Sequence, residues 1–140
     1  PLLVAGMVQN EGEPGGGPFW LRDDKGTLRA QIVESAEMNT EDPAVRDCVG
    51  RATHFNPVDL VCAMHDELGQ AYNLVDFVDE SRDFVVSKSH GGRPLKGLEH
   101  PGLWNGAMGR WNTVFVEVHP ATFAPVKTIF DLLRPAHRSH

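Results

Sequence analysis

The sequence predicts an α/β domain in which a mixed β-sheet with several hairpins is accompanied by short helices. Apolar segments of strand length recur along the 140 residues, and only a few segments have helical spacing. Fourteen glycines and ten prolines interrupt these segments at short intervals, which is typical of turns. A chain of this length can bury a sizeable hydrophobic core. We therefore expect residues 1–140 to form a single domain or part of one.

The first strand is expected at residues 1–8, which are almost entirely apolar, and a glycine-rich loop follows at residues 10–17. Residues 19–22 and 27–34 predict a hairpin, because the connecting residues 23–26 end in a glycine suited to the left-handed position of a turn. Domains usually begin in polar sequence at the surface, whereas this chain begins in a strand. This start leads us to expect either a piece of a larger protein or a chain whose initiator Met before Pro1 has been removed.

Two short helices are expected. The first begins with Thr40 as its N-cap, has Pro43 in its first turn and ends near Val49. The second spans residues 127–133 and ends before Pro135, which cannot continue a helix. The side chains of the first helix that are expected to face the core are Ala44, Val45, Cys48 and Val49.

The rest of the chain predicts further strands joined by turns. Residues 66–69 and 90–93 contain the glycines that hairpin turns need. A helical turn is expected within residues 102–111. The expected strands are residues 58–64, 71–74, 84–87, 94–98 and 113–118.

The composition argues against several classes of partner. The net charge of −6 disfavours binding to nucleic acid or to an anionic membrane surface, which usually needs a basic excess. No apolar segment is long enough for a transmembrane helix. Cys48 and Cys62 fit no zinc or disulfide pattern, so we expect a reducing, cytoplasmic environment.

Three features in the first half of the chain are candidates for ligand binding. Gly15, Gly16 and Gly17 either let the backbone approach a ligand closely or form a turn with no ligand role. Glu34 ends a strand, where α/β sheets commonly bind ligands, so its carboxylate either recognises hydroxyl groups or is an exposed charge. Asn56 precedes a proline and favours extended backbone, so its amide either projects into a pocket or belongs to a turn.

Lys127 stands at the start of the second expected helix. Helix N-termini and ammonium groups both attract anions, which makes Lys127 a candidate phosphate ligand. The other interpretation is a surface lysine. The seven histidines lack the spacing of known metal motifs and predict no metal site.

Three segments resemble UTP–glucose-1-phosphate uridylyltransferases. Residues 123–133, Phe-Ala-Pro-Val-Lys-Thr-Ile-Phe-Asp-Leu-Leu, resemble a signature near the end of that catalytic domain. Residues 26–36 resemble its Gly-x-Leu-x-Leu-Leu-Glu-x-Ala segment, and residues 54–56, His-Phe-Asn, resemble its Phe-Asn. A closer resemblance covers essentially the whole chain. It is to an uncharacterised bacterial family that looks nucleotidyltransferase-like, and its motifs stand at residues 10–20 and 101–108.

The resemblance implies the sugar-binding half of a Rossmann-like nucleotidyltransferase fold. Its partners would be a sugar-1-phosphate and a nucleoside triphosphate, which react to give a nucleotide sugar and pyrophosphate. Glu34 and Asn56 would bind sugar hydroxyls, and Lys127 would hold phosphate as the catalytic residue. The other substrate-binding residues that we expect are Gly15, Gly16, Gly17, His54 and Asn105.

The resemblance also implies Mg²⁺, but this chain has no identifiable nucleotide-binding loop and no identifiable Mg²⁺-binding aspartate. The missing amino-terminal half of the fold would supply both, so we expect the isolated chain to be inactive. The alternative is a non-catalytic module that binds carbohydrate or phosphate.

Overall fold

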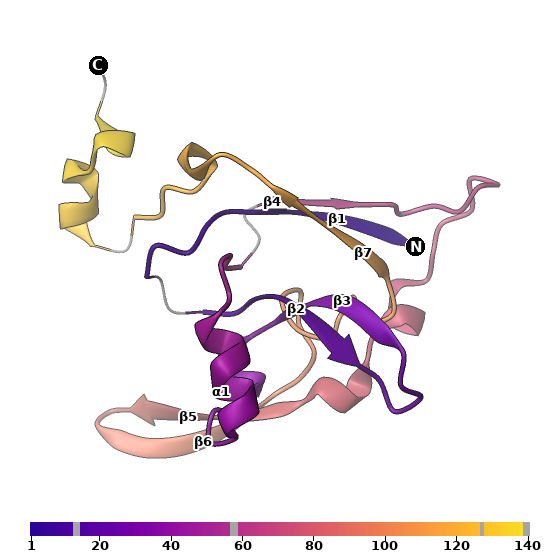
Figure 1. Cartoon of the computed structure of the whole chain (residues 1–140), viewed down its shortest axis with the longest axis horizontal. Helices are drawn as coiled ribbons and strands as arrows, with labels where there is room; N and C mark the ends of the chain where they lie inside the picture. The colour runs from indigo at the N-terminus through magenta and orange to yellow at the C-terminus, as the bar shows by residue number, and fades with distance from the viewer. Residues whose placement is uncertain (13–14, 57–58, 127, 139–140) are drawn as a thin grey trace.

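The computed structural model describes residues 1–12, 15–56, 59–126 and 128–138 (Figure 1). These residues form a mixed α/β structure, which confirms the predicted class, but their strands make three separate sheets instead of one. The strands are β1 (Leu2–Met7), β2 (Gly17–Arg22), β3 (Leu28–Val33), β4 (Asp59–Cys62), β5 (Phe84–His90), β6 (Arg93–Glu99) and β7 (Asn112–Glu117). The helical elements are the α-helix α1 (Pro43–Gly50) and the 3₁₀ helices η1 (Ser35–Glu37), η2 (Leu74–Phe77), η3 (Glu80–Arg82), η4 (Pro120–Thr122), η5 (Ile129–Leu133) and η6 (Pro135–His137).

The central sheet has the order β4-β1-β7, with β1 antiparallel to β4 and parallel to β7. Leu3, Ala5 and Met7 alternate along β1 and are almost completely buried, so one face of the sheet belongs to the core. The β2–β3 hairpin lies on this side of the sheet (Figure 1). Val61 of β4 and Val114 of β7 both pair with Val4 of β1, and both are exposed. Apolar side chains on the opposite face of the sheet therefore meet solvent.

Two of the expected hairpins are confirmed, and both depend on their turns. The Asp23 carboxylate accepts the backbone N–H groups of Lys25 at 3.0 Å and Thr27 at 2.8 Å, which closes the turn between β2 and β3. Gly26 completes this turn with a φ of +83°, a conformation that side chains disfavour. Between β5 and β6, Gly91 and Gly92 have positive φ in the same way.

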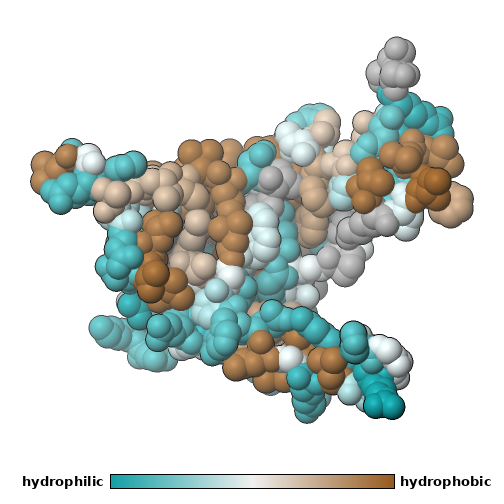
Figure 2. Space-filling view, turned by 180° about the vertical axis from the view of Figure 1, so that it is seen from behind, coloured by the Kyte–Doolittle hydropathy of each residue, from teal (hydrophilic) through white to brown (hydrophobic). Residues whose placement is uncertain are grey.

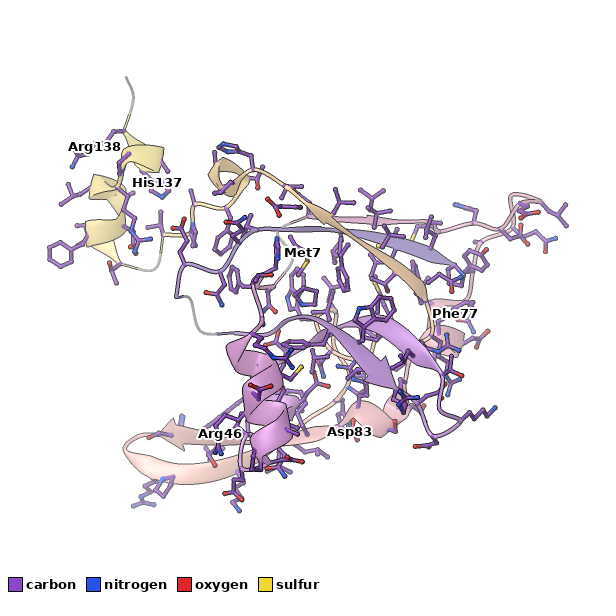
Figure 3. All side chains as sticks on the ribbon, viewed as in Figure 1. Met7, Arg46, Phe77, Asp83, His137 and Arg138 are labelled. Atoms are coloured by element: carbon purple, nitrogen blue, oxygen red, sulfur yellow. The ribbon has the colours of Figure 1, made fainter. Side chains whose placement is uncertain are left out.

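The hydrophobic core joins the central sheet to the β2–β3 hairpin through Leu3, Ile32 and Trp111. Phe77 packs edge-to-face on Trp111, with 6.2 Å between the ring centroids (Figure 3). This contact explains why the strand expected at residues 71–74 is absent: the segment makes one isolated bridge and then turns into η2. An isolated two-stranded hairpin is only marginally stable in water. The packing of Phe77 on Trp111 therefore stabilises this part of the chain more than a strand at residues 71–74 would.

The α-helix differs from the expected one at its start and in its burial. Asp42, instead of Thr40, is the N-cap, and its carboxylate accepts the Ala44 N–H at 2.8 Å. The helix therefore begins at Pro43. The expectation that it faces the core is wrong for Ala44 and Cys48, which are exposed, and the other two side chains are only half-buried. Within the described ranges, no helix has the length and apolar character that a membrane crossing needs.

The second expected helix is only the short 3₁₀ helix η5. Its first turn is closed by Asp131, whose carboxylate accepts the Thr128 N–H at 2.7 Å. Ile129 and Phe130 are largely exposed, and Figure 2 shows apolar side chains on this projecting segment. Residues 102–111 likewise form turns and short bridges instead of the expected helical turn.

A buried ion pair connects η1 to η3. Arg82 donates from Nη2 to both carboxylate oxygens of Glu37, at 2.7 and 2.8 Å, and both side chains are only 9% exposed. Arg82 Nη2 also donates to the Ile32 carbonyl oxygen at 3.0 Å, so the same guanidinium group holds the end of β3. The adjacent elements β3 and η1 and the distant element η3 therefore meet at one side chain.

We expect Arg82→Met to lower the free energy of unfolding by about 3–5 kcal/mol, because it leaves the Glu37 carboxylate buried without its partner. Arg51→Met is the matched control, since Arg51 and its partner Asp47 are 73% and 68% exposed. The control should cost less than about 1 kcal/mol. Urea unfolding followed by tryptophan fluorescence measures both, and equal losses would contradict a structural role for the buried pair.

Candidate functional site

Glu34 and Asn56 meet in space although 22 positions separate them. Glu34 directly follows β3, and Asn56 lies on a segment that the Phe55 N–H ties to the Val8 carbonyl oxygen at 3.2 Å. Asn56 Nδ2 donates to Glu34 Oε1 at 3.0 Å. The structure therefore brings together two of the side chains that the sequence analysis singles out.

The amide of Asn56 presents a free acceptor at this place. Its Nδ2 faces Glu34, because an ionised carboxylate can only accept hydrogen bonds. Its Oδ1 is consequently turned away, and this buried oxygen has no hydrogen-bond partner within the described part of the chain. A buried acceptor without a partner costs about 1–3 kcal/mol, which a ligand donor would recover.

The glycine loop packs directly against these residues. A side chain at Gly15 would contact the Asn56 amide nitrogen at 3.5 Å. At Gly16 a Cβ would lie 2.0 Å from the Val33 carbonyl oxygen, and at Gly17 it would lie 2.8 Å from the His54 carbonyl oxygen. Gly16 and Gly17 can therefore be replaced by no other residue without moving the backbone, because the atoms that a Cβ would overlap are backbone carbonyl oxygens. We call Gly15, Gly16, Gly17, Glu34 and Asn56 the Glu34 cluster.

The electrostatics of Glu34 differ from those of a surface carboxylate. Burial raises the pKa of its carboxyl above the ordinary value, the hydrogen bond from Asn56 lowers it in part, and the Glu37 charge raises it further. The Glu34 backbone N–H donates to Glu37 Oε2 at 2.8 Å, so the carboxylate that pairs with Arg82 also positions Glu34.

The structure does not place the remaining expected site residues in the Glu34 cluster. His54 bonds through Nε2 to Glu117 at 3.0 Å and lines a separate cavity beside β2. Asn105 lies in the turns before β7, where its Oδ1 accepts the Gly102 N–H at 3.2 Å beside residues of the core. Lys127 lies outside the described residues.

Sequence reasoning missed Glu37 and Arg82, which hold the cluster in place. They are 45 positions apart, and neither belongs to a motif, so no local signal joins them. Among the described residues, no three His, Cys, Asp or Glu side chains converge in a way that could hold a metal ion.

One family model matches the chain. It is described as a domain of unknown function (DUF4301), and it covers residues 1–138. No curated protein and no solved structure matches the chain.

We expect Gly16→Ala to destabilise the fold by about 1–3 kcal/mol, the usual cost of overpacking, because its methyl group would overlap the Val33 carbonyl oxygen. Gly50→Ala is the control: it lies at the end of α1 with nothing within 4 Å of the added Cβ, and it should leave stability equal or higher. Thermal and urea unfolding measure both variants. A Gly16→Ala protein as stable as the control would show that the loop does not require glycine.

We expect Glu34 to lower stability as the pH rises, because a raised pKa means that the folded state binds the proton more tightly than the unfolded chain. The contribution is fully present below the ordinary pKa of 4.5 and is lost as the pH passes the higher folded-state value. Glu34→Gln cannot ionise, so its unfolding free energy minus that of wild type should grow over this interval. Urea unfolding at a series of pH values measures the difference, and a constant or shrinking difference would contradict the assignment.

Proposed function

We propose that this chain, which belongs to the DUF4301 family, is the sugar-phosphate-binding part of a nucleotidyltransferase-like enzyme. In this proposal the Glu34 cluster binds the hydroxyl groups of a sugar-1-phosphate. The sugar phosphate oxygen attacks the α-phosphorus of a nucleoside triphosphate, the bond to the β-phosphate breaks, and pyrophosphate leaves. The described residues would act by binding and orienting the sugar, which is a large part of catalysis in such transfers.

The observation that carries the proposal is the acceptor pair at Glu34 and Asn56. Asn56 Oδ1 is a buried acceptor with no partner in the described ranges, and the Glu34 carboxylate next to it keeps lone pairs beyond the one that Asn56 uses. Adjacent hydroxyl groups on a sugar ring are donors that suit two neighbouring acceptors. A sugar hydroxyl would satisfy the buried Oδ1 once a local rearrangement exposed this atom to the ligand.

The glycine loop supports the same ligand class. Gly15 brings the loop backbone next to Asn56, because a Cβ there would already lie at van der Waals distance, 3.5 Å, from the Asn56 amide nitrogen. Gly16 and Gly17 pack against backbone on both sides, which holds this stretch of loop in one position. A rigid loop and a preorganised carboxylate lower the entropy lost on binding.

The phosphate and metal contacts rest on the resemblance to uridylyltransferases. Lys127 would bind phosphate, and its placement lies outside the described residues. The described residues provide no cluster that fits Mg²⁺, so we assign no ligand to the ion and no step to it.

We expect Glu34→Gln to weaken the binding of hexose 1-phosphates by about 10- to 100-fold, since it removes a charged acceptor of a sugar hydroxyl. The fold should be retained, because the Gln carbonyl can still accept from Asn56 Nδ2. Isothermal titration calorimetry with glucose, galactose, mannose and N-acetylglucosamine 1-phosphates measures the affinities.

Glu41→Gln is the matched control, because it removes an exposed carboxylate nearby in the sequence and should bind as wild type does. Equal affinity of the wild type and Glu34→Gln would remove Glu34 from the site. If the wild-type chain bound none of the four compounds, the sugar-phosphate function itself would be wrong.

A further inference from the structure

The cavity that His54 lines has a volume of about 300 Å³ and lies between β2 and the central sheet. Trp20 forms one wall, and it is 72% exposed although it is the largest apolar side chain on the hairpin. Met7 of β1 and Phe115 of β7 line the cavity from the sheet, and Figure 3 shows Met7 pointing from β1 toward the hairpin. We call this cavity the Trp20 pocket. Its exposed indole is a flat apolar surface on which a ring can stack.

One edge of the Trp20 pocket is polar and fixed. His54 forms hydrogen bonds through both ring nitrogens, from Nε2 with Glu117 Oε2 at 3.0 Å and from Nδ1 with the Thr53 hydroxyl at 2.9 Å. Gln9 Nε2 donates to the other oxygen of Glu117 at 3.4 Å. The Glu117 side chain remains 59% exposed, so its carboxylate retains acceptor positions open to the pocket.

We propose that the Trp20 pocket is a carbohydrate site that binds a neutral pyranose ring. The apolar C–H face of the ring would stack on Trp20, and hydroxyl groups at its rim would donate to Glu117. Small-ligand sites commonly combine apolar walls with a few polar groups that fix the orientation of the ligand, and this cavity has the size of a small one. The proposal stands on this pocket alone and does not require the Glu34 cluster to bind a sugar phosphate.

The charges around the pocket favour a neutral ring over a nucleotide. A nucleobase could also stack on an indole, but the phosphates attached to it need cationic partners. The described residues that line the pocket include one carboxylate and one histidine, with no lysine or arginine among them. A phosphate brought next to Glu117 would therefore be repelled.

The test is a titration of the ¹⁵N-labelled 140-residue chain with methyl α-D-glucopyranoside, observed at the tryptophan indole N–H signals. The Trp20 signal is identified by its absence in Trp20→Phe. We expect it to shift saturably. Trp20→Ala has no such signal, so its affinity is measured at the backbone amide signals of Met7 and Phe115 and should be about tenfold or more weaker than that of wild type. Trp104→Ala is the matched control, because Trp104 is partly exposed but lies outside the pocket, and it should bind as wild type does.

Glu34→Gln separates this proposal from the proposed function. It should leave methyl glucoside binding at the Trp20 pocket unchanged while it weakens sugar-phosphate binding. The proposal is overturned if the Trp20 signal does not respond to the glucoside, or if Trp20→Ala binds as tightly as wild type. A response to uridine in place of the glucoside would reassign the pocket to a nucleobase. A shift that follows protein concentration alone would identify a self-association surface.

Discussion

The arrangement of the Glu34 cluster depends on the bidentate pair between Arg82 and Glu37. Arg82 reaches from η3 to the Ile32 carbonyl oxygen near the end of β3, and Glu37 accepts the backbone N–H of Glu34. Both charges are buried, so each needs the other, and the chain must bring η1 and η3 together to satisfy them. The direction in which β3 ends, and hence the position of the Glu34 carboxylate opposite Asn56, follows from this requirement.

The parts of the structure that were predictable are those set by local chemistry. The β2–β3 turn depends on an aspartate and a glycine that are close in the sequence. The strand expected at residues 113–118 was predicted by its β-branched side chains. The sheet arrangement was not predictable, because which strands pair depends on contacts across the whole chain. The pairing of Glu34 with Asn56 followed from the resemblance, whereas Arg82 carried no local signal. The expected carboxyl-terminal α-helix is instead a short 3₁₀ helix, and its apolar side chains stay exposed instead of packing on another element that the structure describes.

The segment that carries His54 and Asn56 connects the two proposed binding places. It is held in an extended form by bonds to β1 and its continuation, including the Asn10 N–H to the Thr53 carbonyl oxygen at 2.9 Å. His54 lines the Trp20 pocket, and Asn56 donates to Glu34 in the Glu34 cluster. One short stretch of backbone therefore sets the geometry of both places. The glycine loop packs on the same stretch, at the His54 carbonyl oxygen. A displacement of this segment would therefore alter both places together.

The first strand of the chain occupies the middle of the central sheet. Leu2 is paired with Asn112 and Met7 with Glu117, so the parallel partner of β1 comes from the far end of the sequence. During synthesis, β1 leaves the ribosome before β7, and the whole intervening segment 8–111 must be made before that partner exists. During this interval it is an apolar strand with an open edge, the kind of segment that chaperones protect from aggregation. The central strand of this sheet therefore gains its parallel neighbour only after residues 8–111 have been synthesised.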